Sequence, residues 1–339
     1  MKKIAMMAAM LLVAVTMVMG NPGGEWMDEL GVGLALTPLA TQKSIFLSSL
    51  KEEYEKIDTW LSNAEDLSSF VTDAQQIKFP EGGADPAVYK NRTTDVDSVE
   101  PTETVYSEDL DVYDSQNYKI RNIWLHALPF EKVQFYTRKS ADSIVKKELN
   151  DAAYHFAPEQ AGNKTIVMPT TGAAGTDNLK TIQLADVMEL AKKADRMQMP
   201  DGQRVLVLPS DWWWELVSSN DILKAQMSYQ QNNGVIDPKV VNYYGIKIEK
   251  SYGDNLNLGF DTSTNKKAAQ GAVITGTVKP CALFFCGQEV YRAGGQMEMF
   301  YQDKSTNPTG RAYEFGFQHR FKAGHQMSGD RYTGLIYKA

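Results

Sequence analysis

The sequence predicts an α+β protein in which one long helix packs on a sheet that the C-terminal segment completes. Three observations support this prediction. Helical periodicity extends from Phe130 to Tyr154. Strand-like and helix-like segments then alternate between residues 165 and 285. Beyond residue 286, apolar stretches of strand character are separated by breaks at Asn307–Gly310 and Ala323–Gly324.

The long helix is the element around which we expect the chain to be organised. Apolar side chains recur along it at three- and four-residue steps, and charged side chains fill the opposite face. Pro129 precedes it, where a missing N–H costs little, and Pro158 stops it soon after Tyr154. At 1.5 Å per residue it is about 35 Å long. No catalytic residue stands out on it, so we interpret it as a structural element.

The composition is that of an ordinary globular protein, with 43% hydrophobic and 23% charged residues among 339. Thirty-five basic against 42 acidic side chains give a formal net charge of -7, which argues against a dedicated nucleic-acid binder. Cys281 and Cys286 lie five residues apart in one apolar run, so on a strand they face opposite ways. This spacing disfavours a disulfide between them, and two cysteines alone make no metal site.

The first twenty residues have the layout of a secretory signal peptide. Lys2 and Lys3 precede an uncharged apolar run that ends at Gly20, and the run is short for a membrane span. Two other interpretations stay open. Met27 is a plausible true start codon, and the segment could equally be a buried N-terminal arm.

A second helical pattern covers Ser44 to Phe70, with Trp60 on its apolar side. It is interpreted either as an arm that docks on a neighbouring subunit or as an ordinary core helix.

An extended hairpin is predicted next. Ile77–Phe79 forms its first strand, a turn begins at Pro80, and Val88–Arg92 returns.

The segment from Thr93 to Tyr118 holds eight acidic residues and no lysine or arginine. A calcium site is not predicted, because the spacing of an EF-hand is missing. A solvated or partner-facing pair of acidic strands is the better interpretation.

The middle of the chain predicts strands at Thr165–Met168, Arg204–Pro209 and Gly245–Glu249, and helices at Leu184–Ala194 and after Ser210. Later strands are predicted at the segments Ala272–Val278, Ala282–Phe285, Gln296–Tyr301, Ala312–Phe321 and Tyr332–Tyr337.

Trp212, Trp213 and Trp214 suggest carbohydrate binding. Consecutive helical residues diverge by about 100°, however, so core or interface burial is the better interpretation.

No motif for catalysis or for a cofactor emerges from the sequence. The four histidines lack zinc spacing, and neither a G-x-S-x-G elbow nor a phosphate-binding glycine loop is present. Acidic pairs are common, but nothing in the sequence places two of them across a bond to be cleaved. We therefore expect no enzyme, no catalytic residue, no metal and no cofactor.

The order of segments from Val71 to Ala339 resembles the major capsid proteins of tailed phages with the HK97-like fold. Arg204–Pro209, followed by the tryptophan helix, is similar to an arginine–valine–hydrophobic–proline strand that precedes a helix in that family. Asn242–Ile248 is similar to its G-F-K-I strand. The C-terminal part of the chain, from Arg292 to Phe300 and again at Gly334–Ile336, is similar to the returning peripheral strands of that family. The resemblance covers about four-fifths of the chain.

The resemblance implies an HK97-like division of the chain. Residues 21–70 form an N-terminal arm with an amphipathic helix, and residues 71–105 form the E-loop hairpin. Residues 106–164 and 286–339 form the peripheral domain with its long spine helix. Residues 165–285 form the α/β axial domain, and residues 1–20 are the signal-like segment or a mis-called start.

The function implied is that of a self-assembling structural subunit of an icosahedral phage head that encloses double-stranded DNA. Its partners would be copies of itself in hexamers and pentamers, with portal, scaffolding or decoration proteins as further partners. Packaged DNA would be bound only weakly and without specificity, and the mature form would contact no membrane. Assembly would take place in the cytoplasm of the bacterial host, and the mature protein would reside in the virion. The expected subunit-interface residues are Phe79, Pro80, Tyr89, Lys90, Asn91, Arg92 and Trp60.

The signal-like N-terminus departs from this pattern and keeps a second hypothesis open. Taken at face value, it predicts an exported periplasmic or surface binding protein whose tryptophan-rich segment contacts glycan. A weaker third hypothesis is a secreted hydrolase with a carboxylate pair. A long, exposed hairpin discriminates between these hypotheses, because a monomeric binding protein has no use for it.

Overall fold

The computed structural model describes residues 60–72, 76–81, 87–91, 95, 98, 100, 104–121, 129–175, 177–219, 240–252, 255–302, 312–326 and 329–339. The chain divides into two compact units, Met1–Ile45 and Phe46–Ala339, and every described residue belongs to the second. The signal-like segment, the start at Met27 and most of the second predicted helix therefore lie outside the described residues.

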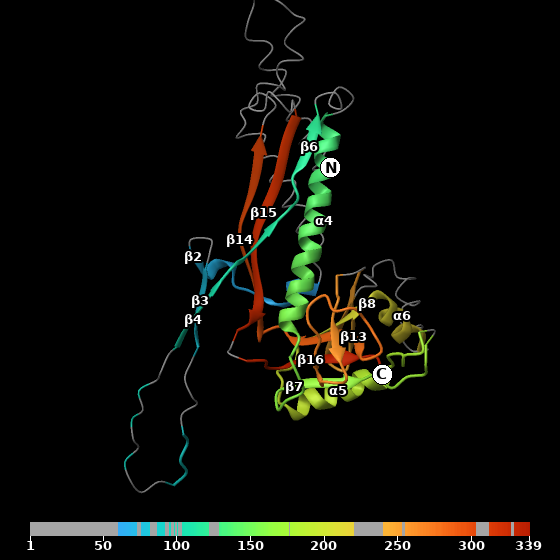
Figure 1. Ribbon diagram of the computed structural model, residues 1–339. Coiled ribbons are helices and arrows are strands. Elements are labelled where there is room, and N and C mark those ends of the chain that lie inside the picture. Colours follow the sequence, from blue (N-terminus) through green and yellow to red (C-terminus); the bar gives the residue numbers. More distant parts are fainter. Residues whose placement is uncertain are drawn as a thin grey trace, which may run out of the picture. The chain divides into compact units, whose positions relative to one another are not determined.

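The described chain is mixed α and β, with all of its named strands in three sheets (Figure 1). The helices are η1 Trp60–Asn63, η2 Ser68–Phe70, α4 Pro129–Phe156, α5 Leu184–Arg196 and α6 Ser210–Ser219. The strands before α4 are β1 Glu65–Asp66, β2 Val71–Thr72, β3 Gln76–Glu81, β4 Thr104–Asp109, β5 Asp111–Asp114 and β6 Tyr118–Arg121. Those after it are β7 Thr165–Pro169, β8 Arg204–Pro209, β9 Val240–Tyr243, β10 Ile246–Ser251, β11 Gly259–Asp261, β12 Lys266–Lys267, β13 Val278–Cys286, β14 Val290–Gln302, β15 Ala312–His325 and β16 Thr333–Tyr337.

The largest sheet has eight strands and is buried on both faces. Its main path runs β12-β11-β13-β8-β10-β9, and β16 pairs with both β13 and β7. Along β13, Cys281 and Phe285 face one core cluster, whereas Phe284 and Cys286 face the other. The expectation that the two cysteines face opposite ways is confirmed, and both are free. Leu190 of α5 and Trp213 of α6, with their apolar neighbours, lie in the cluster that also contains Phe284 and Cys286.

The second sheet has five strands and is built around a long antiparallel ladder. Strands β14 and β15 pair over almost their whole length, β1 pairs with β14, and β5 and β6 pair with β15. The ladder shifts register between Gly294 and Met297, as at a β-bulge. A Cβ at Gly295 would lie 2.8 Å from Cδ1 of Leu110 and 3.0 Å from Cβ of Arg320, so a side chain there would require its neighbours to shift.

Helix α4 confirms the predicted long helix and contacts both large sheets. Its first part buries Ala141 and Ile144 against Phe315 and Phe317 of β15. Its later part buries Val145, Leu149, Ala152, Ala153 and Phe156 in the cluster that covers one face of the eight-stranded sheet. Figure 1 shows α4 running alongside β14 and β15. Burying one face of a helix in two cores couples them mechanically through one rigid element.

The structure corrects four of the predicted elements. Trp60–Phe70 is not helical beyond two short 3-10 turns, and Ala272–Thr277 is not a strand. The hairpin does not return through Val88–Arg92, since its second strand is β4, and Pro80 lies inside β3 rather than in a turn. The last strand, β16, pairs in the eight-stranded sheet and not with the returning peripheral strands.

Candidate assembly surface

The hairpin is anchored to the body of the subunit by a small three-stranded sheet. Strands β3 and β4 pair from Gln76–Asp109 to Glu81–Thr104, and β2 pairs with the beginning of β3. Ile77 is fully buried in a cluster with Leu67, Leu110 and Tyr291. The base of the hairpin is thus part of a core, which fixes the direction in which the rest of it leaves the body.

The remainder of the hairpin is exposed where the structure describes it. Twenty-two residues, 82–103, connect β3 to β4, so the hairpin reaches at most about 40 Å beyond its base. Val88 is 94% exposed and Tyr89 is 58% exposed, and Lys90 and Asn91 are also exposed. This part of the hairpin therefore presents two large side chains, those of Val88 and Tyr89, to solvent.

The predicted interface residues separate into four groups. Tyr89, Lys90 and Asn91 lie on the exposed hairpin, and Phe79 and Pro80 lie in β3, where their backbones pair with β4. Arg92 lies outside the described residues. The prediction for Trp60 is wrong.

Trp60 is 1% exposed and belongs to the core of its own subunit. Its ring packs edge-on against Phe156 of α4, with 6.3 Å between centroids, and at the same separation from Phe285 of β13. This places the beginning of the described chain in the cluster shared by α4 and the eight-stranded sheet. Trp60 therefore stabilises the subunit and has no surface to offer to a neighbour.

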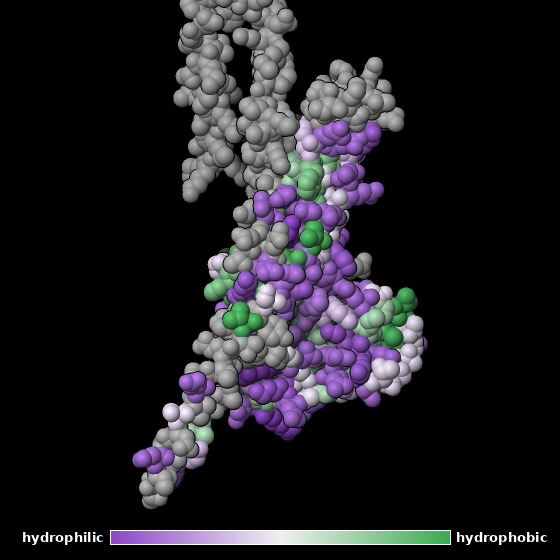
Figure 2. Space-filling view, turned by 60° about the vertical axis from the view of Figure 1, so that its left-hand side comes forward, coloured by the Kyte–Doolittle hydropathy of each residue, from purple (hydrophilic) through white to green (hydrophobic). Residues whose placement is uncertain are grey.

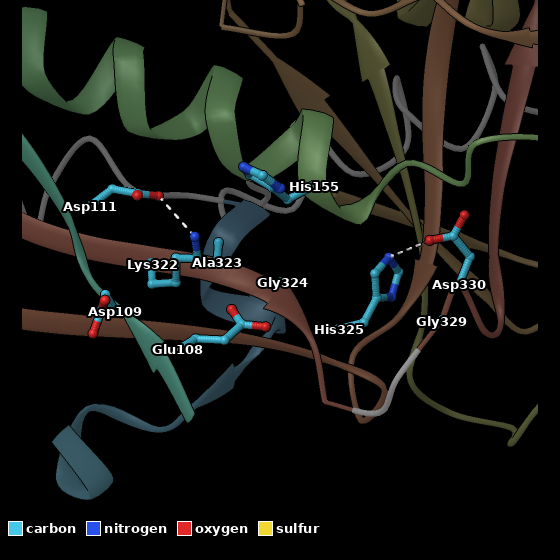
Figure 3. A pocket seen from close by; sticks show the side chains of 10 residues that line it. All are labelled: Glu108, Asp109, Asp111, His155, Lys322, Ala323, Gly324, His325, Gly329 and Asp330. Atoms are coloured by element: carbon cyan, nitrogen blue, oxygen red, sulfur yellow. Dashed lines mark hydrogen bonds and ion pairs between the residues drawn. The ribbon is translucent and has the colours of Figure 1, made fainter. Parts of the chain in front are cut away.

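An open pocket of about 520 Å³ lies beside the hairpin base (Figure 3). It is lined by Glu108, Asp109, Asp111, His155, Lys322, Ala323, Gly324, His325, Gly329 and Asp330. The Tyr291 hydroxyl donates a hydrogen bond to Glu108 at 2.8 Å, and Lys322 pairs with Asp111 at 3.1 Å. Most of the acidic groups nearest the base are thus held by partners within the subunit.

The two histidines of this pocket are biased toward the neutral form. Burial, together with the nearby charges of Lys322 and Lys267, lowers the pKa of His155. Burial also lowers the pKa of His325, although Asp330 at 3.5 Å opposes that shift. No nucleophile is paired with either ring, and no group of three metal-ligating side chains occurs in the described part of the chain.

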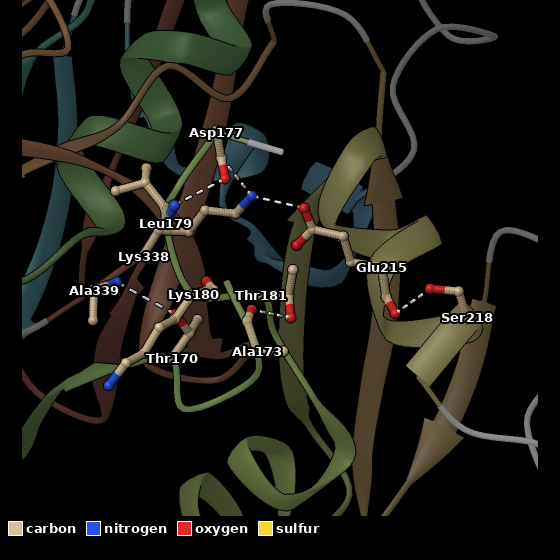
Figure 4. Close-up of polar contacts among 10 residues, drawn as sticks. All are labelled: Thr170, Ala173, Asp177, Leu179, Lys180, Thr181, Glu215, Ser218, Lys338 and Ala339. Atoms are coloured by element: carbon tan, nitrogen blue, oxygen red, sulfur yellow. Dashed lines mark hydrogen bonds and ion pairs between the residues drawn. The ribbon is translucent and has the colours of Figure 1, made fainter. Parts of the chain in front are cut away.

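A second polar cluster closes the C-terminal end of the eight-stranded sheet (Figure 4). The side chain of Lys338 is 5% exposed, and its ammonium group donates to Glu215 of α6 at 2.7 Å and to Asp177 at 3.0 Å. The backbone N–H of Ala339 donates to the Thr170 hydroxyl, and the N–H of Lys180 donates to the Ala339 carbonyl. The last two residues therefore tie α6 and the loop after β7 to the sheet.

The tryptophan run does not form a stacking platform. Trp212 and Trp213 are buried, and only Trp214 is exposed. The rings of Trp213 and Trp214 stand at 88° to each other, with centroids 4.9 Å apart. Lys250 lies over the exposed ring at 4.9 Å. The interpretation of this segment as core is confirmed for two of the three residues.

The described surface on the face shown in Figure 2 is largely hydrophilic, with separate apolar spots. Exposed large side chains occur on several elements, among them Phe135, Val273 and Phe300. None of the described helices is long and apolar enough to cross a bilayer.

The fold is similar to that of solved phage capsids at low sequence identity. The asymmetric unit of the mature capsid of bacteriophage PhiM1 has a TM-score of 0.53 and 10% identity, over 81% of this chain and 85% of that chain. The head of Helicobacter pylori bacteriophage KHP40 has a TM-score of 0.52 and 11% identity, over 84% and 90%. The capsid of Ralstonia phage GP4 has a TM-score of 0.52 and 10% identity, over 82% and 87%.

No protein-family model and no curated protein matches the sequence. The likeness therefore stands on the arrangement of elements over most of the chain. That arrangement confirms the fold expected from the order of the sequence segments: this chain has the HK97-like capsid fold.

Proposed function

We propose that the chain is a major capsid protein, the self-assembling subunit of a tailed-phage head that encloses double-stranded DNA. The observation that carries the proposal is the exposed hairpin on a buried base, in a chain whose fold is that of phage capsids. A subunit that assembles with its neighbours needs a projection with a firmly anchored base, whereas a monomeric protein has no use for such a projection.

The proposed mechanism is mutual clamping of identical subunits. Tyr89, Lys90 and Asn91 on the exposed hairpin would contact an adjacent copy, with Phe79 and Pro80 holding the hairpin in register. Hexamers and pentamers would then close into a shell in the host cytoplasm, aided by portal, scaffolding or decoration proteins. The role is structural rather than enzymatic, and the division into arm, hairpin, peripheral and axial domains is part of the same proposal.

The tryptophan segment no longer supports the alternative hypothesis of an exported glycan-binding protein. Its glycan contact required an exposed tryptophan platform, whereas two of the three rings are buried and the third stands perpendicular to its neighbour. Residues 1–20, on which its signal peptide rests, lie outside the described part of the chain.

The test is assembly of the full chain, expressed in the bacterial cytoplasm in parallel with a version that starts at Met27. Size-exclusion chromatography and negative-stain microscopy should show rings, sheets or shells. Tyr89→Ala/Lys90→Ala should shift the protein toward monomer, because it truncates the exposed contact. The matched control, Tyr252→Ala/Lys192→Ala, removes the same residue types from other exposed positions and should still assemble. A chain that stays monomeric in both versions would refute the proposal.

A further inference from the structure

The C-terminal end of α4 is capped by a lysine from another element. The ammonium group of Lys267, on β12, donates hydrogen bonds to the backbone carbonyls of Tyr154 at 2.8 Å and Ala157 at 2.7 Å. The same nitrogen lies 4.2 Å from the centre of the Tyr154 ring. The last carbonyls of a helix have no partner within the helix, and its negative end favours a cation. Lys267 therefore holds β12 against the last turn of α4.

This lysine is a partly buried cation with little compensation. Burial lowers the pKa of Lys267, and the charges of Asp330 and Glu159 oppose that shift. Within the described ranges, no carboxylate forms an ion pair with its ammonium group, whose acceptors are the two neutral carbonyls. Lys322 of β15, by contrast, pairs with Asp111 at 3.1 Å. Lys267 is therefore the more easily displaced of the two lysines when further positive charge is added nearby.

Two histidines lie beside this lysine. His155 belongs to the last turn of α4 and His325 to the end of β15, and both line the pocket at the hairpin base (Figure 3). Burial lowers the pKa of both rings, and the charge of Lys267 acts in the same direction on each. Lys322 adds to this effect at His155, and a charge on His155 disfavours one on His325. At neutral pH both rings are therefore uncharged and leave Lys267 in place.

Acidic groups face the two rings from the pocket. The acidic residues that line it or act on its histidines are Glu108, Asp109, Asp111, Asp151 and Asp330. Asp111 favours a charged His155, and Asp330, at 3.5 Å, favours a charged His325. Lys267 is not among the residues that line the pocket. A ring that gains a proton is thus repelled by Lys267 and attracted toward the carboxylates of the pocket.

The direction of the pH dependence follows from these charges. A histidine whose pKa is lowered in the folded chain stabilises the fold above its unfolded value of about 6.5, and that contribution is lost as pH falls. Protonation of both rings raises the number of cations beside the last turn of α4 from two, Lys267 and Lys322, to four.

We propose that the end of α4 is a proton-sensitive joint. When His155 and His325 are charged, they displace the ammonium group of Lys267 from its two carbonyls, which releases β12 from the last turn of α4. The inference goes beyond the shell function and does not depend on it.

Hydrogen exchange of the full-length chain tests the joint, with labelling times corrected for the intrinsic effect of pH. Between about pH 7.5 and about pH 5.5, exchange in peptides that cover the last turn of α4 and β12 should rise about tenfold, because a pKa difference of one unit corresponds to a tenfold change in an equilibrium. Amides of β8, inside the eight-stranded sheet, should keep their protection.

Three variants locate the response. His155→Gln/His325→Gln should remove it, because glutamine gains no proton. Lys267→Met should raise exchange at both pH values, so that acid adds little. The matched control, Lys266→Met, removes the neighbouring exposed lysine, which pairs with Glu159 at 3.4 Å, and should leave the response to acid at its wild-type size.

Each of four results would overturn the inference. Equal exchange of the wild-type chain at both pH values excludes the joint. A parallel loss of protection in β8 indicates global unfolding instead of local release. A response that survives in the double histidine variant belongs to other groups, and a full response in Lys267→Met shows that this lysine is not the element that moves. The first two results need no substitution, so they decide the matter even where a variant does not fold.

Discussion

Replacing Lys338 with methionine should destabilise the subunit by removing the ammonium group that joins Glu215 to Asp177. Methionine retains about the length of the side chain but removes the ammonium group, together with its contact over the ring of Trp212 at 5.4 Å. The loss is then electrostatic. Two carboxylates, 24% and 44% exposed, are left facing each other without the cation.

The magnitude follows from this partial burial. Breaking a fully buried ion pair costs about 3–5 kcal/mol, and an exposed pair contributes at most about 1 kcal/mol. Lys338 is buried, but its partners are in partial contact with water, so we expect a loss of about 2 kcal/mol. That corresponds to roughly a 30-fold change in the ratio of folded to unfolded chains. The control Lys192→Met removes an exposed lysine that pairs with Glu189 at 3.6 Å, and should cost under about 0.5 kcal/mol.

The effect should depend on pH in a defined direction. Burial alone would lower the pKa of Lys338, but hydrogen bonds with Glu215 and Asp177 outweigh it and raise the pKa above 10.5. A raised lysine pKa stabilises the fold fully below its unfolded value, and that stabilisation is lost as pH rises through the folded value. The difference between wild type and variant should therefore be complete at neutral pH and shrink above pH 10.5.

Urea unfolding of the unassembled full-length chain, followed by tryptophan fluorescence, measures this difference because Trp212 lies beside the substituted position. Equal stability of variant and wild type at neutral pH would refute a stabilising role for the ion pairs of Lys338 with Glu215 and Asp177. A loss of the same size on both sides of the lysine titration would refute its electrostatic origin.

Three further predictions concern the core and the pocket. Trp60→Ala should cost about 3–5 kcal/mol in urea unfolding, because it empties the space between Phe156 and Phe285, whereas Trp214→Ala at an exposed position should cost under about 1 kcal/mol. Gly287→Ala should lower the melting temperature, since its Cβ would lie 2.3 Å from the Asn63 carbonyl oxygen, whereas Gly276→Ala meets open space; equal melting temperatures would contradict the close approach. The free energy of unfolding should fall as pH drops below about 6.5, because the pKa values of His155 and His325 are lowered in the folded state and the unfolded chain binds more protons. His155→Gln/His325→Gln should flatten that dependence, and an unchanged slope would assign it to other groups.

The sequence predicted well what depends on long, local patterns. Helix α4 repeats its apolar positions over more than six turns, so no tertiary contact was needed to recognise it. The buried strand Arg204–Pro209 and the helix after it were equally clear, because a continuous apolar run ends in proline before a helix. The order of these elements was enough to predict the capsid fold.

The errors share one cause, which is that the deciding contact lies far away in the sequence. Trp60–Phe70 has helical periodicity, but Trp60 packs between α4 and β13, and the backbone N–H of Leu67 donates to Arg292. Tertiary contacts override a weak local preference. The hairpin's true return strand is acidic and lacks apolar alternation, so only its pairing with β3 reveals it.

The exposure of the proposed interface residues was predictable only in part. Tyr89, Lys90 and Asn91 lie in a segment whose exposure follows from its turn-rich surroundings, whereas Trp60 sits on an apolar helix pattern that gave no sign of which surface would cover it.

The position of β16 makes folding of the subunit depend on the last strand of the chain. This strand lies between β7 and β13, and Leu335 and Ile336 enter opposite cores. A ribosome that stalls before Thr333 leaves two inner strands with facing rows of unsatisfied amides and carbonyls, and neither apolar layer can close. A polypeptide that ends before Thr333 therefore exposes apolar surface and unpaired backbone groups, the features that chaperones and proteases recognise.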